Sequence, residues 1–291
     1  MTRDVVEAGG FRLGVTVREP ACGAAPGSVV LYLHGGGLLF GERDDLPETW
    51  AGMLARAGHR LVALDYPLAP ETPVGRILDV CEEAVRALAL DSALALLERG
   101  YVLFGRSAGA YLALKLASRL VRARDVPAPR GVMDFYGYPS LEDARLVAPS
   151  RHYTKLAPVD EATALAHVGG APTRGALSER FLLYVWARQQ GRWMELIGAG
   201  TPEVRAACSL GEGELAALPP VFACAGTADQ DVPFGASRRL RQVASSVTWV
   251  PVYDAGHDFD RDPGSPQARD VYERAVSWLG ALDAGEPVRR P

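Results

Sequence analysis

The stretch Tyr101-Val-Leu-Phe-Gly-Arg-Ser-Ala-Gly109 joins a short apolar run to a segment of helical spacing that continues to Leu120. The pattern predicts a buried strand over 101–104 and a helix over 108–120, with Ser107 at the sharp turn between them. Glycines at 105 and 109 remove the side chains that would clash in such a turn. The Ser107 hydroxyl would then stand at the carboxyl edge of a sheet, where the N–H groups of the helix start also point.

Outward from this stretch, short apolar runs alternate with longer helical patterns, which predicts an α/β fold with a mostly parallel sheet flanked by helices. The other expected strands are Val5-Val6, Phe11–Val17, Val29–Leu33, Leu61–Tyr66, Val132–Tyr136, Val221–Ala225 and Val247–Tyr253. Further helices are expected over about 50–57, ended by Gly58, over 77–88 and over 267–282.

The alternation stops between residues 139 and 218, where only helix-like segments such as 181–187 and 193–197 occur. An insertion of this size in an α/β pattern usually forms a cap over the strand ends, where such folds place their sites. A helical subdomain that only packs against the rest is the alternative. We therefore expect one core, formed by residues 1–138 and 219–291, with a helical cap insertion over 139–218.

The composition excludes several classes of protein. The chain has 291 residues and is 48% apolar, which is ample for a large core. Its 31 basic and 35 acidic residues give a net charge of −4, which argues against a nucleic-acid partner. Lys115 and Lys155 are its only lysines, and the chain has no asparagine, so it holds no N-glycosylation acceptor.

Cysteine and hydropathy patterns point to a reduced protein without a membrane partner. The four cysteines are far apart and form no C-x-x-C pair, which disfavours a zinc site and a disulfide framework. The first residues lack the pattern of a signal peptide, and no apolar run approaches the ~18 residues that span a bilayer. We expect no metal, no cofactor and a cytoplasmic location.

A second motif, His34-Gly-Gly-Gly37, follows the expected strand 29–33. Successive glycines let the backbone approach a reacting group closely and present several N–H donors, as an oxyanion formed in acyl transfer requires. A phosphate-binding loop is the competing interpretation. It would need a downstream Lys-Ser/Thr or a G-x-G-x-x-G pattern, and the chain has neither after this strand. We expect the N–H groups of Gly35, Gly36, Gly37 and Ala108 to form an oxyanion hole.

Together with Asp65-Tyr-Pro-Leu-Ala-Pro-Glu71, these two motifs resemble, in order and spacing, the hormone-sensitive-lipase-like branch of the α/β-hydrolase superfamily. That branch consists mostly of microbial carboxylesterases. The similarity covers nearly the whole chain, and it is densest over residues 29–109. It implies the α/β-hydrolase fold and a serine hydrolase that cleaves small to medium carboxylic esters through an acyl-enzyme. Because members are often monomers or dimers, it also allows a homodimer.

A serine nucleophile needs a base and a carboxylate that orients the base. The superfamily order of serine, acid and histidine selects His257, in Asp254-Ala-Gly-His-Asp-Phe259, as the base. His34 is expected to orient the oxyanion loop, and the other histidines are expected to be structural. After the strand 221–225, Asp229 stands where the resemblance places the acid. Asp231 is the alternative candidate for the acid, but its side chain is expected instead to accept hydrogen bonds from the backbone amides of the turn.

The expected substrate is a small acyl compound, and the residues expected to line its pocket are Leu38, Phe40, Arg106, Phe181, Tyr184 and Trp186. Arg106 departs from the family pattern, which often has an acidic residue before the nucleophile. It either pairs with an internal carboxylate near the oxyanion loop or biases the site towards anionic substrates. Because motifs do not reveal the acyl acceptor, acyl transfer, cyclisation and amide cleavage remain alternatives to ester hydrolysis. A further alternative is a protein that keeps the fold and binds a ligand without catalysis.

Overall fold

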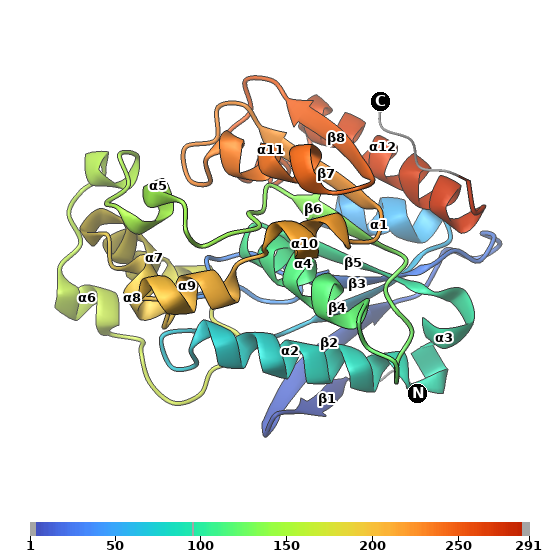
Figure 1. Cartoon of the computed structure of the whole chain (residues 1–291), viewed down its shortest axis with the longest axis horizontal. Helices are drawn as coiled ribbons and strands as arrows, with labels where there is room; N and C mark the ends of the chain where they lie inside the picture. The colour runs from blue at the N-terminus through green and yellow to red at the C-terminus, as the bar shows by residue number, and fades with distance from the viewer. Residues whose placement is uncertain (1–3, 95, 287–291) are drawn as a thin grey trace.

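The computed structural model describes residues 4–94 and 96–286, so residues 1–3, 95 and 287–291 of the expected core lie outside the described residues. Eight strands form one sheet in the order β1-β2-β4-β3-β5-β6-β7-β8 (Figure 1). They are β1 (Val5–Ala8), β2 (Phe11–Arg18), β3 (Val29–Leu33), β4 (Arg60–Leu64), β5 (Tyr101–Arg106), β6 (Gly131–Phe135), β7 (Val221–Gly226) and β8 (Val247–Val252). The pairs β1–β2 and β2–β4 are antiparallel and the remaining pairs are parallel. The expected mostly parallel sheet is confirmed.

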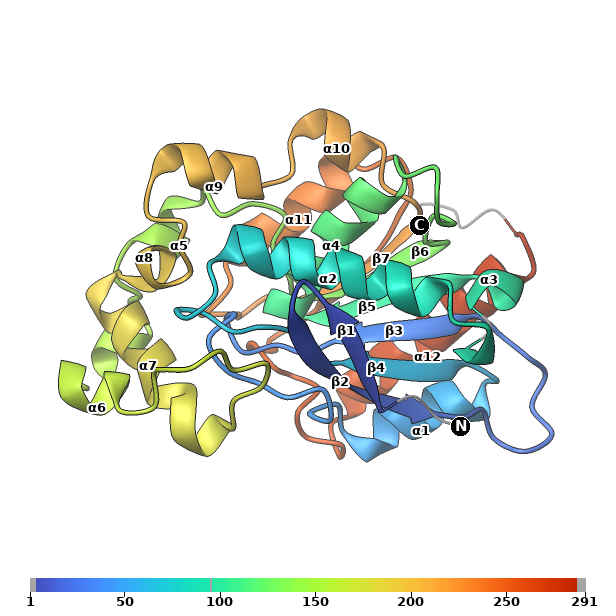
Figure 2. The same cartoon turned by 90° about the horizontal axis from the view of Figure 1, so that it is seen from below.

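Helices cover both faces of the sheet. Figure 2 shows α1 (Glu48–Arg56) and α12 (Pro266–Asp283) on one face, and α2 (Val74–Ala89), α4 (Ala108–Leu120) and α11 (Phe234–Val243) on the other. Every residue of β3, β5, β6 and β7 is buried between these layers, which is why their sequences are nearly continuous apolar runs. Gly58, with φ of +93°, follows α1 as the expected helix stop. The short helices η1 (Ser92–Leu94) and α3 (Leu96–Arg99) precede β5.

Residues 139–218, which connect β6 to β7, contain helices and no strand. The helices are α5 (Ala144–Val147), η2 (Tyr153–Lys155), α6 (Glu161–Leu165), α7 (Leu177–Gln190), α8 (Trp193–Leu196), α9 (Pro202–Cys208) and α10 (Glu212–Ala216). In both views α5 to α9 lie together at one end of the sheet (Figures 1 and 2). An isolated β-bridge joins this segment to the loop after β3: the N–H of Gly41 donates to the carbonyl of Gly175 at 2.8 Å, and the reverse bond is 2.9 Å.

Three further observations concern membranes, metals and thiols. Over residues 4–94 and 96–286, no helix combines the length and the apolar character needed to cross a bilayer. Within the same residues no group of three or more His, Cys, Asp or Glu side chains is arranged to hold a metal ion. All four cysteines are free thiols.

Candidate active site

The turn from β5 to α4 holds Ser107 in a backbone conformation that few residues other than glycine adopt, with φ of 53° and ψ of −117°. The glycines on either side make this turn sterically feasible. A Cβ added to Gly105 would lie 2.1 Å from the Gly109 carbonyl oxygen, and one added to Gly109 would lie 2.1 Å from the Leu33 carbonyl oxygen. The motif therefore places the Ser107 hydroxyl at the carboxyl end of the central strand.

Three side chains from different loops form a continuous hydrogen-bonded chain at this point. The Oγ of Ser107 lies 2.9 Å from His257 Nε2, and His257 Nδ1 lies 2.7 Å from Asp229 Oδ2. Asp229 lies in the turn after β7, and its other oxygen accepts the N–H groups of Asp231 at 2.8 Å and Val232 at 2.9 Å. The structure thus places the expected base within hydrogen-bonding distance of both the expected nucleophile and the expected acid.

Burial and the neighbouring carboxylates have opposite effects on the pKa of His257. Burial lowers the pKa of His257, but the charge and hydrogen bond of Asp229, with smaller effects of the Asp258 and Asp231 charges, outweigh burial and raise the pKa above its ordinary value. An imidazolium at this position is therefore stabilised, which is what a base that takes a proton from serine needs.

The glycines after His34 form a tight loop beside Ser107. Gly36 has φ of 99° and Gly37 has φ of 59°. A Cβ on Gly36 would lie 1.9 Å from the Phe40 carbonyl oxygen, and one on Gly37 would lie 2.4 Å from the Tyr184 ring. None of the hydrogen bonds between described residues uses the N–H of Gly35, Gly36 or Gly37. Ala108 is the first residue of α4, where the N–H has no partner within the helix.

His34 and its neighbours hold this loop from behind. Its Nδ1 lies 2.8 Å from the Gly35 carbonyl oxygen, and its ring stacks on Tyr66 with centroids 4.1 Å apart. The Tyr66 hydroxyl donates to the His34 carbonyl at 2.9 Å, and Trp193 Nε1 donates to the Gly37 carbonyl at 2.9 Å. Burial lowers the pKa of His34, which favours the neutral ring. This is the arrangement expected of a histidine that orients the loop.

The stretch 65–71 ties the same loop to α7. Glu71 forms a buried ion pair with Arg180 of α7 at 2.9 Å. The guanidinium of Arg180 also donates to the carbonyls of Leu39 at 2.7 Å and Ala69 at 2.8 Å. One arginine therefore connects the loop after β3, the loop after β4 and the helical segment 139–218.

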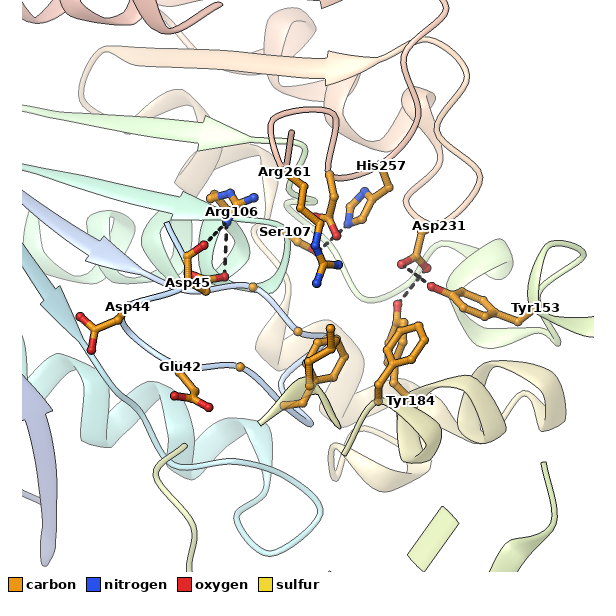
Figure 3. Close-up of a pocket in the computed structure, with 18 residues that line it drawn as sticks. Glu42, Asp44, Asp45, Arg106, Ser107, Tyr153, Tyr184, Asp231, His257 and Arg261 are labelled. Atoms are coloured by element: carbon orange, nitrogen blue, oxygen red, sulfur yellow. Dashed lines mark hydrogen bonds and ion pairs between the residues drawn. The ribbon is translucent and has the colours of Figure 1, made fainter. Parts of the chain in front are cut away.

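A cavity of about 270 Å³ opens beside Ser107 (Figure 3). It is lined by Gly35, Gly36, Gly37, Phe40, Gly41, Glu42, Asp44, Asp45, Arg106, Ser107, Tyr153, Leu177, Phe181, Tyr184, Asp231, His257, Asp258 and Arg261.

Four of the six expected pocket residues, Phe40, Arg106, Phe181 and Tyr184, lie among these lining residues. Leu38 and Trp186 do not. Leu38 is completely buried in the core, and Trp186 faces away to pack against the Arg192 guanidinium, 5.0 Å from its ring centroid. Helical spacing on α7 identified the apolar residues, but did not show which side of the helix faces the cavity.

Among the charged side chains around the cavity, Arg106 was expected to line it and Asp231 was the alternative acid, whereas Glu42, Asp44, Asp45 and Arg261 were not singled out from the sequence. Five carboxylates line it, from Glu42, Asp44, Asp45, Asp231 and Asp258. The guanidinium groups that line it are those of Arg106 and Arg261. Glu42, Asp44 and Asp45 follow the glycines 35–37 within a few residues, and this closeness in sequence was the signal that could have placed them at the site.

Arg106 is an internal ion-pair partner. It is only 5% exposed, and its Nη2 lies 2.8 Å from Asp260 Oδ1 and its Nη1 lies 3.3 Å from Asp45 Oδ2. The hydroxyls of Tyr136 and Tyr272 donate to the same Asp260 carboxylate at 2.7 and 2.8 Å. Burial raises the pKa of Asp260, but the Arg106 charge and these bonds outweigh it and leave the pKa below its ordinary value. This geometry favours the first of the two expected roles of Arg106, pairing with internal carboxylates.

Asp231 differs from the expectation. Its side chain does not satisfy the turn amides; Asp229 does so. The Asp231 carboxylate instead accepts hydrogen bonds from Tyr153 at 3.1 Å and Tyr184 at 2.8 Å, as Figure 3 shows. Tyr153, which the sequence did not single out, thus belongs to the site.

Residues 30–261 of the chain match the model of a protein family described as alpha/beta hydrolase fold. The chain is 37% identical over 119 residues to the carboxylesterase/phospholipase LipF of Mycobacterium tuberculosis, covering 38% of this chain and 30% of that protein. It is 34% identical over 150 residues to the esterase LipI of the same organism, covering 50% and 45%. The chain therefore spans less than half the length of either relative.

Two solved structures are similar over almost the whole chain. A Staphylococcus aureus protein of unknown function is 29% identical with a TM-score of 0.83, and the alignment covers 96% of this chain and 98% of that one. An alpha/beta hydrolase superfamily protein from Enterococcus faecalis is 28% identical with a TM-score of 0.80 at the same coverage.

Proposed function

Because the chain belongs to the alpha/beta hydrolase fold family, we propose that it is a serine carboxylester hydrolase that cleaves a small to medium ester through an acyl-enzyme. The observation that carries this proposal is the unbroken chain of hydrogen bonds from Ser107 through His257 to Asp229. The partial similarity to LipF and LipI, both named as esterases, supports the same reaction.

In the first step, the Ser107 Oγ attacks the acyl carbonyl carbon and His257 Nε2 takes the hydroxyl proton. Asp229 accepts the hydrogen bond from Nδ1, which keeps Nε2 free to act as the base and stabilises the imidazolium. The N–H groups of Gly36, Gly37 and Ala108, together with that of Gly35, bind the oxyanion. Each such donor typically contributes a factor of about 10² to 10³ to turnover.

Collapse of the tetrahedral intermediate breaks the ester C–O bond, and His257 returns the proton to the departing alcohol oxygen. Water then attacks the acyl-enzyme, with His257 again as base. This second half releases the carboxylic acid and restores the Ser107 hydroxyl.

The shape of the cavity supports a substrate of modest size. At about 270 Å³ it is near the lower end of ordinary small-molecule sites. Phe40, Leu177, Phe181 and Tyr184 give it an apolar wall, which suits a short acyl or alcohol group. In this proposal residues 139–218 are the cap, since Tyr153, Leu177, Phe181 and Tyr184 of that segment line the cavity, and residues 1–138 with 219–291 are the core.

The direct test is hydrolysis of a series of p-nitrophenyl esters of increasing acyl length. We expect turnover on short chains, and a loss of about 10⁴-fold or more in kcat for Ser107→Ala. Ser277→Ala, at an exposed serine of α12, is the matched control and should keep full activity. Full activity of Ser107→Ala would contradict the proposal.

Acyl transfer to another nucleophile is the second candidate. The chain is 25% identical over 305 residues to the non-reducing polyketide synthase trt4 of Aspergillus terreus, covering 86% of this chain and 12% of that enzyme. Since the acyl-enzyme is common to both reactions, adding amines, alcohols and thiols to the assay separates them. Preferential capture of the acyl group by an added nucleophile at millimolar concentration would favour transfer over hydrolysis.

A further inference from the structure

Asp231 contacts two different parts of the molecule. Its backbone N–H donates to Asp229 Oδ1 at 2.8 Å, inside the turn after β7. Its carboxylate faces the helical segment 139–218, where it accepts from the Tyr153 and Tyr184 hydroxyls and lies 3.1 Å from Arg188 Nη1. One residue therefore contacts both the carboxylate that holds His257 and the helices that cover the cavity.

Arg188 fixes this carboxylate firmly. Its guanidinium is buried, lies 4.9 Å from the Trp193 ring centroid, and donates to the Tyr184 hydroxyl at 3.0 Å. Its Nη2 also donates to the Asp231 backbone carbonyl at 3.2 Å. Because a buried charge is costly to leave unpaired, Asp231 and Arg188 restrain each other's position strongly.

Asp229 depends on the turn that Asp231 anchors. One of its oxygens is occupied by the N–H groups of Asp231 and Val232, and the other accepts His257 Nδ1. The direction of the second oxygen therefore follows from where the two amides lie. A shift of Asp231 would rotate the carboxylate that orients the imidazole.

We propose that Asp231 is a positioning residue through which Tyr153, Tyr184 and Arg188 of the segment 139–218 set the orientation of Asp229 and so of His257. The inference rests on the proposed function, in which Asp229 is the acid of the triad. It assigns the helical segment a part in the chemistry besides shaping the pocket.

The first test removes the two hydroxyls and keeps both rings. In Tyr153→Phe/Tyr184→Phe we expect kcat on a short p-nitrophenyl ester to fall about 10-fold to 100-fold, because a small misplacement of a catalytic group has effects of that size. KM should stay within about twofold, since the apolar wall is unchanged. Tyr138→Phe is the matched control. The ring centroid of Tyr138 lies 5.8 Å from that of Trp193, and its hydroxyl is buried and has no hydrogen-bond partner among the described residues. It should leave kcat unchanged.

A double-mutant cycle then separates positioning from direct contact with the substrate. If the tyrosines act through the carboxylate, their replacement in an Asp231→Ala background has little further effect, because no side-chain oxygen remains there to accept their hydroxyl groups. If the hydroxyls bind the substrate directly, the losses multiply. Multiplying losses would overturn the proposal.

A spectroscopic measurement tests the same claim without turnover. The proton on His257 Nδ1, bonded to Asp229, should give a strongly downfield NMR resonance, assigned by its loss in His257→Ala. We expect this resonance to shift or broaden in Asp231→Asn and in Tyr153→Phe/Tyr184→Phe, and to be unchanged in Tyr138→Phe.

An unchanged resonance and kcat in the folded tyrosine double variant would overturn the inference, even if Asp231→Asn failed to fold. If the unmodified chain hydrolyses no ester, the proposed function fails, and the resonance still decides whether Asp231 positions Asp229.

Discussion

His257 carries two hydrogen bonds that fix its direction and its ionisation. Nδ1 faces Asp229 and Nε2 faces Ser107. The neighbouring charge of Asp258 adds to that of Asp229 in raising the pKa of His257 against the effect of burial. The base must be neutral to accept a proton, so these charges decide the pH at which the reaction begins to slow.

We expect kcat/KM to fall on the acid side as His257 becomes protonated, with a midpoint above the ordinary value of about 6.5. Removing one carboxylate charge makes the imidazolium less favourable, so Asp258→Asn should move this midpoint to lower pH. The activity on the alkaline plateau should change less than about threefold. The measurement is a pH profile of ester hydrolysis.

Asp262→Asn, in the same loop, is the control for this profile and should leave the midpoint in place. A midpoint that moves to higher pH in Asp258→Asn would contradict the electrostatic account of His257.

Ser107 could be predicted from its motif between a predicted strand and a predicted helix, and Asp229 and His257 from the positions that the family resemblance gives to the acid and the base. The role of Asp231 could not. Asp229 and Asp231 lie in the same turn, and local sequence offers both the same amides. What distinguishes them is a contact with Tyr153 and Tyr184, residues 78 and 47 positions away, which only the folded chain reveals.

At the level of elements, β6 ends in a buried carboxyl group. One oxygen of Asp134 accepts the N–H of Gly137 at 2.9 Å, and the other has no partner among the described residues. Burial is the main cause that raises the pKa of Asp134 to about 7, against the smaller effect of the Gly137 hydrogen bond. The folded chain therefore holds this proton where the unfolded chain, with a pKa of about 3.9, releases it.

This difference makes stability depend on pH. Because the pKa is raised in the folded state, the stabilising effect of the proton is complete below about pH 3.9 and is lost as pH rises through about 7. Asp134→Asn removes this titration. Relative to the unmodified chain, its free energy of unfolding should rise by on the order of 2 kcal/mol between pH 5 and pH 8.

Urea unfolding at the two pH values measures this effect, with the exposed Asp270→Asn as control. The expectation is wrong if the difference in the free energy of unfolding between Asp134→Asn and the unmodified chain is the same at pH 5 and pH 8.

The strands and long helices were predictable because burial on two faces or one face leaves a periodic apolar pattern. Of the short helices between β6 and β7, α8 falls on the predicted helix-like segment 193–197, and the others were not predicted. Their positions are set by contacts distant in sequence, such as the bonds from Arg180 to Glu71, Leu39 and Ala69. On α7 the apolar spacing identified the helix, but not that Trp186 faces away from the cavity.

At the scale of the molecule, three buried ion pairs join the loops of the site. Arg106–Asp260 connects the turn of the nucleophile to the loop of His257. Arg180–Glu71 and Arg188–Asp231 connect the helical segment 139–218 to the loops after β4 and β7, respectively. Arginine suits all three, because its planar guanidinium serves several acceptors at once. The arginine-rich composition thus enters the architecture of the site, which the total charge did not indicate.

The central claim is that Ser107 forms a covalent acyl-enzyme. The most direct measurement is intact-protein and peptide mass spectrometry after incubation with a fluorophosphonate, which phosphonylates an activated serine with loss of fluoride. We predict one adduct per chain, on the peptide that contains Ser107, and no adduct in Ser107→Ala or in chain unfolded before incubation. An unlabelled folded chain, or a label on another residue that persists in Ser107→Ala, would contradict the account.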